Sequence, residues 1–364
     1  MAALTTTQLA NIDDSDLAAL TSTQMASMSS LQLSGLQAGQ MDNLSTGVVQ
    51  ALNLNQLKGI ASSQVAALLT NQVQAFTTTQ MAAFSTAQLA GFTSNQLQHF
   101  STAQMKALVT AQLASLSTTQ LRGLDATLLA ALATTQVKGL RSDQLANLST
   151  SQLTGMVSAQ LAVLSTQQMG GLTSQQLSTF SNLQLNGLTS AQLGAWSDQQ
   201  LDGLSSVQLA ELANTQLSGL GTALFRSLAD TQLEGLTSAK IAGFSTAQLA
   251  ALTTSAIASL SVNQIDGVTS KQMQALTTAQ IASLTETQIV DLSTTQIAVL
   301  SVAQLDSLTI AQVQAIATTW NDTTTSLSAG MSAWQQHGIT TTQITQLNAA
   351  HTTGTSAMSV LFGV

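Results

Sequence analysis

The chain of 364 residues contains no cysteine and no proline. Without cysteine it has no disulfide framework, no cysteine-ligated metal and no thiol nucleophile. The absence of proline suits a fold in which every segment uses its backbone N–H, because proline lacks that donor. The absence of cysteine is compatible with an oxidising or a reducing compartment.

Charged residues are also scarce, at 7% of the chain against about 25% in a typical soluble protein. Ser, Thr, Gln and Asn supply most of the polarity instead. The formal net charge is −8, the pI is near 4.5, and the eight basic residues are scattered along the sequence. Phosphate binding needs clustered Lys and Arg, so we predict no nucleic-acid partner.

Long apolar runs and clusters of reactive side chains are missing too. No run approaches the roughly 18 residues that a membrane span requires, and residues 1–8 lack the basic and apolar regions of a classical signal peptide. His99, His337 and His351 have no partner at metal-ligand spacing. We therefore predict no transmembrane segment, no cofactor and no catalytic, cofactor-binding or metal-binding residues, and we expect the protein not to be an enzyme.

One eight-residue unit occupies most of the sequence. From residue 5 to residue 316 this octad recurs 39 times without insertion or deletion. Position one is mostly Ser or Thr, position four is mostly Gln, and positions five and eight are apolar in every copy; residues 101–108 (Ser-Thr-Ala-Gln-Met-Lys-Ala-Leu) are an example. A fixed short period is typical of a solenoid. We predict an octad-repeat solenoid over residues 1–316.

The spacing within the octad favours helices. The apolar positions alternate in steps of three and five; a step of three places both side chains on one face of a helical turn, whereas a strand needs even steps. Ser/Thr-x-x-Gln is also a capping-box pattern. A single continuous helix would turn its apolar face by roughly 80° per octad. We predict an all-α solenoid of very short helices. The alternative is a β-solenoid with 16-residue coils, because Thr, Gln and Leu ladders suit stacked strands.

A 16-residue period lies beneath the eight. Glycine at position seven recurs at multiples of 16, from Gly59 to Gly267, and the octads of that phase always have Gln at position four. In the other phase this Gln is replaced in six octads, by Asp16, Val48, Leu128, Leu224, Lys240 and Ala256. We predict two unequal octads paired into a two-walled 16-residue coil. Glycine would permit a left-handed turn or a close backbone approach.

Two interpretations of the Gly-phase glutamines stay open. They form a buried hydrogen-bonded ladder with their copies one coil away, or they are exposed partners of the helix caps. A buried ladder would explain why replacements occur only in the other phase. Among those replacements, we expect Lys240 to face solvent.

The two ends depart from the repeat. Asp13, Asp14 and Asp16 indicate a polar N-terminal cap. Residues 317–364 leave the register, and residues 326–337 are typical of an amphipathic helix. We interpret 317–364 as a cap on the last coil. The alternatives are a secretion signal or a segment that joins subunits.

Phe76, Phe84, Phe92 and Phe100 are the only concentrated departure from the consensus. They occupy position eight of four successive octads, so we expect them in the core. They would be the candidate patch if the chain were a binding protein. Acidic residues at positions six and seven are isolated from one another, and His99 is expected at the surface.

The repeated Ser/Thr-x-x-Gln-Leu-x-x-Leu unit over residues 5–316 resembles long, low-complexity bacterial proteins. Such proteins are often named "heme utilization or adhesion" or repeat-containing surface proteins. The resemblance implies a structural role outside a bacterial cell or on its surface, and it implies no site residues. The heme part of the name has no support here, because no histidine is placed as an axial ligand.

These observations favour a structural protein that assembles with copies of itself into filaments, a sheath or a biofilm matrix, or that forms an adhesin stalk. It would leave the cell by a route without an N-terminal signal peptide, for example through a C-terminal signal. A cell surface or a glycan is a further partner to consider. The alternatives are a soluble solenoid that binds a protein or glycan, and an ice-binding protein whose hydroxyl groups form a regular array.

Overall fold

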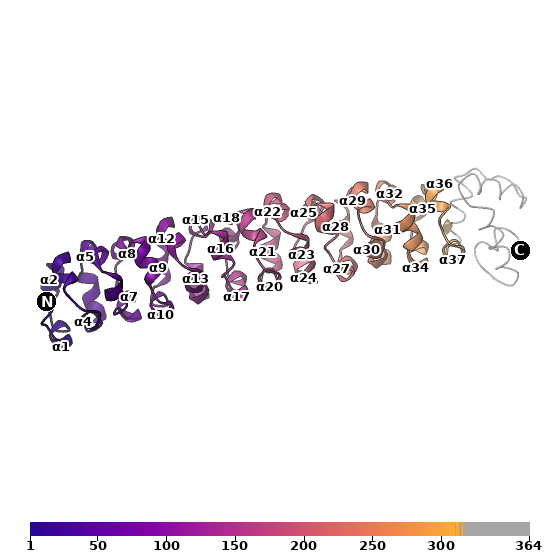
Figure 1. The fold of residues 1–364 in the computed structure, drawn as a ribbon. Coiled ribbons are helices and arrows are strands. Elements are labelled where there is room, and N and C mark those ends of the chain that lie inside the picture. Colours follow the sequence, from indigo (N-terminus) through magenta and orange to yellow (C-terminus); the bar gives the residue numbers. More distant parts are fainter. Residues whose placement is uncertain (310, 313–314, 316–364) are drawn as a thin grey trace, which may run out of the picture. The chain divides into compact units, whose positions relative to one another are not determined.

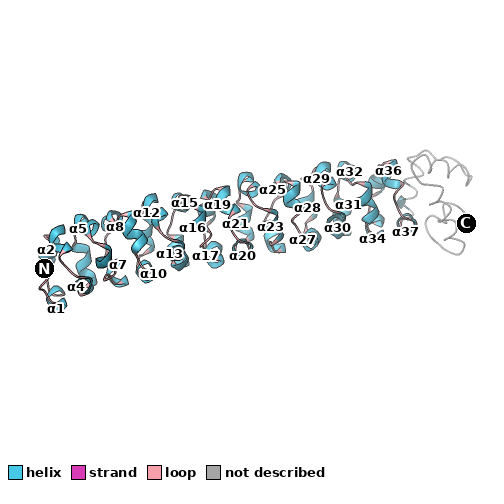
Figure 2. Cartoon of the chain, viewed as in Figure 1, coloured by secondary structure: helices cyan, strands magenta, loops and turns pink. Residues whose placement is uncertain are grey.

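The computed structural model describes residues 1–309, 311–312 and 315. The chain divides into two compact units, Met1–Leu188 (unit 1) and Thr189–Val364 (unit 2). In both units the described residues form one short helix per octad, and they form no β-strand (Figures 1 and 2). The predicted all-α solenoid is confirmed, and the β-solenoid alternative is wrong. The predicted C-terminal segment 317–364 lies outside the described residues.

The helices of unit 1 are α1 (Thr6–Leu9), α2 (Asp14–Ala18), α3 (Ser22–Ala26), α4 (Ser30–Ser34), the 3₁₀ helix η1 (Ala38–Asn43), α5 (Thr46–Ala51), α6 (Leu54–Leu57), α7 (Ser62–Ala67), α8 (Thr70–Ala75), α9 (Thr78–Ala83), α10 (Thr86–Leu89), α11 (Ser94–Gln98), α12 (Thr102–Ala107), α13 (Thr110–Ser115), α14 (Thr118–Arg122), α15 (Ala126–Ala130), α16 (Thr134–Val137), α17 (Ser142–Ala146), α18 (Thr150–Gly155), α19 (Ser158–Ala162), α20 (Thr166–Met169), α21 (Ser174–Ser178) and α22 (Asn182–Asn186).

The described helices of unit 2 are α23 (Ser190–Gly194), α24 (Asp198–Asp202), α25 (Ser206–Glu211), α26 (Asn214–Leu217), α27 (Thr222–Ser227), α28 (Asp230–Leu233), α29 (Ser238–Ala242), α30 (Thr246–Ala251), α31 (Thr254–Ser259), α32 (Val262–Asp266), α33 (Ser270–Ala275), α34 (Thr278–Ala282), α35 (Glu286–Val290), α36 (Thr294–Ile297) and α37 (Val302–Asp306).

The octad of residues 101–108 shows why each unit starts and stops a helix. Ser101 is extended (φ −74°, ψ 157°), and its Oγ accepts a hydrogen bond from the Gln104 backbone N–H at 3.2 Å. The Gln104 side chain returns the bond, because its Oε1 accepts from the Ser101 N–H at 2.8 Å. The helix ends where Leu108 becomes extended again (φ −65°, ψ 136°). The predicted capping box is confirmed.

Helices this short are marginal in water by themselves, so burial of the apolar pair must hold them. Positions five and eight supply that burial. Met105 is 0% exposed and Leu108 is 2% exposed. From Met28 onward the described residues at both positions are buried, in unit 1 and in unit 2 alike. The predicted core positions are confirmed.

The coil of the solenoid is longer than 16 residues. Each helix contacts the third helix along: α7, α10 and α13 follow one another in unit 1 (Figure 1), and α27, α30 and α33 do so in unit 2. Side-chain hydrogen bonds also reach 28 and 31 residues back, into the fourth octad before. A coil therefore contains three to four octads, and the predicted two-walled 16-residue coil is wrong.

The reason lies in the junction between helices. Two extended residues, at positions eight and one, separate each helix from the next. They turn the chain so that three to four octads complete a circuit, and the apolar pairs converge on a common axis instead of facing each other across two walls. The spacing of apolar residues in the sequence does not contain this turning angle.

The 16-residue alternation is explained by the contacts between successive coils. Each octad packs against the octad three places earlier, and because the two kinds of octad alternate, that neighbour is always of the other kind. At that contact a Cβ added to Gly59 would lie 2.0 Å from the backbone oxygen of Ser30, and one added to Gly219 would lie 2.3 Å from that of Ser190. The predicted close approach at glycine is confirmed. The predicted left-handed turn is wrong at Gly123, for example, where φ is −73°.

Candidate functional site

The position-four glutamine joins successive coils. In addition to capping its own helix, Gln104 donates from Nε2 to the carbonyl oxygens of Val73 and Phe76, each at 2.9 Å. These carbonyls are at positions five and eight of the octad four places earlier. A primary amide has one acceptor oxygen and two N–H donors. One side chain therefore binds the start of its own helix and the end of a helix in the preceding coil, where the Val73 carbonyl also accepts from the Phe76 N–H at 3.3 Å.

The same arrangement, which we call the glutamine clamp, recurs throughout both units. Donation to carbonyls 28 and 31 residues earlier is made in unit 1 by Gln40, Gln56, Gln64, Gln72, Gln80, Gln88, Gln96, Gln104, Gln112, Gln120, Gln136, Gln144, Gln152, Gln160, Gln168, Gln176 and Gln184, and in unit 2 by Gln232, Gln248, Gln264, Gln272, Gln288, Gln296, Gln304 and Gln312.

These bonds settle the two interpretations of the glutamines. The side chains are buried, as the ladder interpretation requires, and they are also cap partners. Their partners across the coil are backbone carbonyls, so a ladder of glutamine on glutamine is wrong. Both phases are buried: Gln56 and Gln64, from adjacent octads, are each 2% exposed. Burial therefore does not distinguish the phases.

The choice of Gln over Glu at position four is a sequence signal for the clamp. Glu fits a capping box as well as Gln does, yet Glu never occupies position four. Only the amide has N–H donors for the second set of carbonyls. The identity of the acceptors needs the coil length, which the sequence does not give.

Lys240 takes the place of one glutamine and makes one of the two inter-coil hydrogen bonds that a glutamine clamp makes. Its Nζ donates to the carbonyl oxygen of Leu212, which is 28 residues earlier and is the position-eight acceptor of a clamp. The side chain is partly buried. The prediction that Lys240 faces solvent is wrong, because an ammonium donor can satisfy a carbonyl that an apolar replacement would leave open.

The four phenylalanines form a cluster inside unit 1. Successive rings from Phe76 to Phe100 meet edge to face, with centroids 5.0, 5.4 and 5.3 Å apart. Each ring is 4% exposed or less. Edge-to-face contact is a favoured aromatic geometry, so the rings stabilise the packing of four successive octads. The predicted core position is confirmed, so these rings offer no surface for a ligand.

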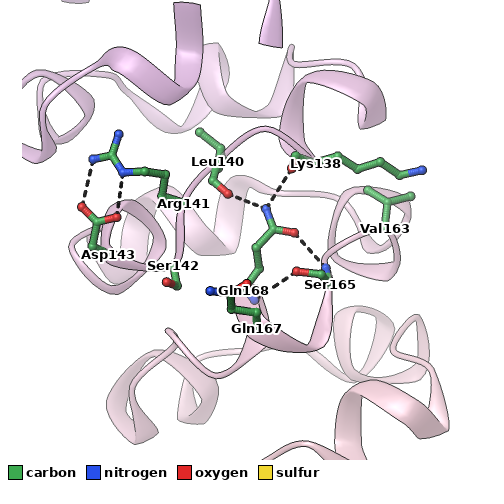
Figure 3. Close-up of a pocket in the computed structure, with 9 residues that line it drawn as sticks. All are labelled: Lys138, Leu140, Arg141, Ser142, Asp143, Val163, Ser165, Gln167 and Gln168. Carbon is green, nitrogen blue, oxygen red and sulfur yellow. Dashed lines mark hydrogen bonds and ion pairs between the residues drawn. The ribbon is translucent and has the colours of Figure 1, made fainter. Parts of the chain in front are cut away.

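A groove of about 630 Å³ lies on unit 1 between residues 138–143 and residues 163–168 (Figure 3). One ion pair stands beside it: the Arg141 guanidinium donates to both carboxylate oxygens of Asp143 at 2.9 Å. The hydrogen bond from Arg141 lowers the pKa of Asp143 below its ordinary value. Arg141 also donates to the carbonyl of Ala114. The floor is a glutamine clamp, with Gln168 Nε2 2.6 Å from the Leu140 oxygen.

A second groove, of about 560 Å³, lies on unit 2. It is lined by Glu234, Gly235, Leu236, Thr237, Ser238, Ser261, Asn263, Gln264 and Asp266. Two carboxylates therefore border it, and both belong to exposed side chains at position six. These two acids were predicted to be isolated from each other, but they lie on the same groove because their octads are four apart.

His99 is exposed, as predicted, and its Nδ1 lies 2.7 Å from the backbone oxygen of Asn95. In the part of the chain that the structure describes, no three His, Asp or Glu side chains gather as a metal site. His337 and His351 lie outside that part. No helix among the described residues has the length and apolar character needed to cross a membrane.

Coils of short helices, joined by buried clamps, define this chain as an α-solenoid repeat protein. A family model described as the ALTTAQ repeat matches residues 65–102, 73–110 and 241–278. The first two matches begin eight residues apart, and the third begins 168 residues, or 21 octads, after the second, so all three share the octad register. No curated protein matches the chain.

Proposed function

We propose that the protein is a non-enzymatic structural repeat protein whose copies assemble outside the cell into a filament, sheath or matrix. The observation that supports this proposal is the use of the polar groups. In the octad of Gln104, for example, the side-chain amide and the cap hydroxyl make hydrogen bonds within the octad and to the preceding coil. The remaining surface is neutral for the most part, and the octad that forms it recurs every eight residues.

A repeating surface favours association between copies. A contact that one octad makes with a neighbouring molecule is available again 32 residues further on, so weak contacts add along the length of the pair. A contact between two different surfaces of the same chain does not close on itself, and it produces a fibre instead of a dimer. The solenoid thus supplies many equal contacts instead of one strong site.

The extracellular location rests on the resemblance of the Ser/Thr-x-x-Gln-Leu-x-x-Leu repeat to bacterial surface proteins. A stalk that spaces an adhesive segment from the cell is a variant of the same role. The protein-binding and glycan-binding alternatives lose their candidate patch, because the phenylalanine cluster is buried.

Electron microscopy and sedimentation velocity of the purified full chain test assembly. We expect filaments or sheets that grow with protein concentration, across a range of salt and calcium concentrations. Dispersed monomers under all these conditions would overturn the proposal. Immunogold labelling of producing cells tests location separately: label on the surface or in the surrounding matrix is expected, and label confined to the cytoplasm would refute the extracellular role.

A further inference from the structure

Charged side chains at position six align in unit 1. Lys106 and Lys138 are 32 residues apart, and both are exposed. A glutamine clamp fixes their relation: Gln136, two residues before Lys138, donates to the carbonyls of Met105 and Leu108 on either side of Lys106, at 2.9 and 2.6 Å. The two lysines, which we call the basic column, therefore lie on octads four places apart that one clamp joins.

Acidic side chains align in the same way in unit 2. Asp202, Glu234 and Asp266 occupy position six at intervals of 32 residues, and all three are exposed. Gln232 donates to the two carbonyls that flank Asp202, both at 2.9 Å, and Gln264 donates to those that flank Glu234, at 2.6 and 2.7 Å. We call these three residues the acidic column.

The two columns have the same interval because the same clamp sets it. Because the same pair of bonds relates each charged octad to the next, the charges are separated equally in both columns. Within the described residues, none of the five side chains has an ion-pair partner. Two of the eight basic residues that look scattered in the sequence are thus in register.

The two units also differ in overall charge. Residues 1–188 hold five basic and six acidic residues, for a net charge of −1, whereas residues 189–364 hold three basic and ten acidic residues, for a net charge of −7. Two copies that met through unit 2 alone would repel each other. Both units are net negative, so attraction between copies requires local complementarity, which the lysines of unit 1 and the carboxylates of unit 2 offer.

We propose that the basic column of one copy docks against the acidic column of a second copy. This interface rests on the proposed self-assembly and specifies how copies recognise each other. A single exposed ion pair contributes little and is screened by salt, but two lysines in register with two carboxylates bind together. Because each copy has both columns, it has two different neighbours, and the contact propagates.

Charge reversal of each column tests the interface. One variant carries Lys106→Glu and Lys138→Glu, and a second carries Asp202→Lys, Glu234→Lys and Asp266→Lys. Matched controls make the same change of net charge at exposed residues outside the columns: Lys58→Glu with Lys271→Glu, and Asp13→Lys, Asp42→Lys and Glu286→Lys. Far-UV circular dichroism checks that every variant is folded, and sedimentation velocity at low and high salt measures association.

We expect each column variant alone to lose association at low salt by at least about tenfold, and an equimolar mixture of the two to recover it. The controls should retain it. Carbodiimide cross-linking of mixed ¹⁵N-labelled and unlabelled wild-type chains should join Lys106 or Lys138 of one copy to Asp202, Glu234 or Asp266 of another.

Two negative results have different meanings. Wild-type assembly that neither column variant weakens, or that the controls weaken equally, overturns the column interface and leaves the proposed self-assembly intact. Wild-type chains that stay monomeric at every concentration and salt condition overturn the self-assembly and the interface with it.

Discussion

Gln24 and Gln104 hold the same place in the same motif, yet their surroundings differ. Both accept the N–H of their N-cap residue, at 2.9 and 2.8 Å. Gln104 is 2% exposed and also binds two carbonyls of the preceding coil, whereas Gln24 is exposed, because in this chain no octad stands four places before it. The first coil, residues 5–28, thus shows what an octad is like before another coil covers it.

The comparison separates local from inter-coil stabilisation. In the first coil all three helices are already formed, and α1 and α3 have complete capping boxes, whereas α2 has no side-chain cap bond at Asp13. Position eight, however, is only partly buried at Ile12 and Leu20 and becomes fully buried from Met28 onward. A capping box therefore forms within a single octad. Burial of the position-eight side chain and of the position-four amide requires a neighbouring coil.

The largest effect should come from position eight. Leu116 is 0% exposed in an interior coil, and Leu20 is its partly buried counterpart in the first coil. Leu116→Ala should lower the free energy of unfolding by about 2–5 kcal/mol, and Leu20→Ala by about 1 kcal/mol. Urea unfolding followed by circular dichroism measures both. Equal losses would show that the first coil is covered in solution.

The glutamine clamp should give the next largest difference. Gln104→Ala removes the partner of the Ser101 N–H and of the Phe76 carbonyl, and one of the two donors to the Val73 carbonyl, which should cost about 2–4 kcal/mol. Gln24→Ala removes only a cap partner and should cost less than about 1 kcal/mol. Urea unfolding compares the two variants, and hydrogen exchange at Ser101 and Phe76 shows whether opening is local. A Gln104→Ala loss no larger than that of Gln24→Ala would contradict the clamp.

Two glycines, one at a contact between coils and one at an open site, should respond oppositely to an added methyl group. Gly59→Ala would place a Cβ 2.0 Å from the Ser30 oxygen of the neighbouring coil and should destabilise by about 1–3 kcal/mol. Gly47, within α5, has no atom within 4 Å of its added Cβ, so Gly47→Ala should stabilise by about 0.5–1 kcal/mol. Opposite shifts of the thermal midpoint are the expected result, and shifts of the same sign would refute the close approach.

The smallest effect should come from the exposed ion pair of Arg141 and Asp143. Arg141 lowers the pKa of Asp143 in the folded chain, so its stabilisation exists above the ordinary pKa of Asp and disappears as the pH falls through the lowered value. Asp143→Asn should shift the urea midpoint slightly at neutral pH and low salt, and not at all at strongly acidic pH or high salt. A large shift that persists in acid would point to a structural role for the carboxylate.

Much of the fold is legible in a single octad. Ser101 and Gln104 predict the start of the helix, and Met105 and Leu108 predict its buried face. Capping and a three-residue apolar step depend only on neighbours in sequence. The sequence could not show that Lys106 and Lys138 form a column, or that Glu234 and Asp266 border one groove. Those relations need the number of octads in a coil, and a perfect repeat makes every octad an equally good partner for every other.

The amino-acid sequence by itself therefore determined short capped helices, their apolar pairs and an all-α solenoid, since each follows from contacts within eight residues. The tertiary structure decided the coil of three to four octads, the acceptors of Gln104 in residues 73 and 76, and the opposition of Gly59 to Ser30. The physical reason is the turning angle at the two extended residues between helices, which the packing of successive coils fixes and the repeat period does not.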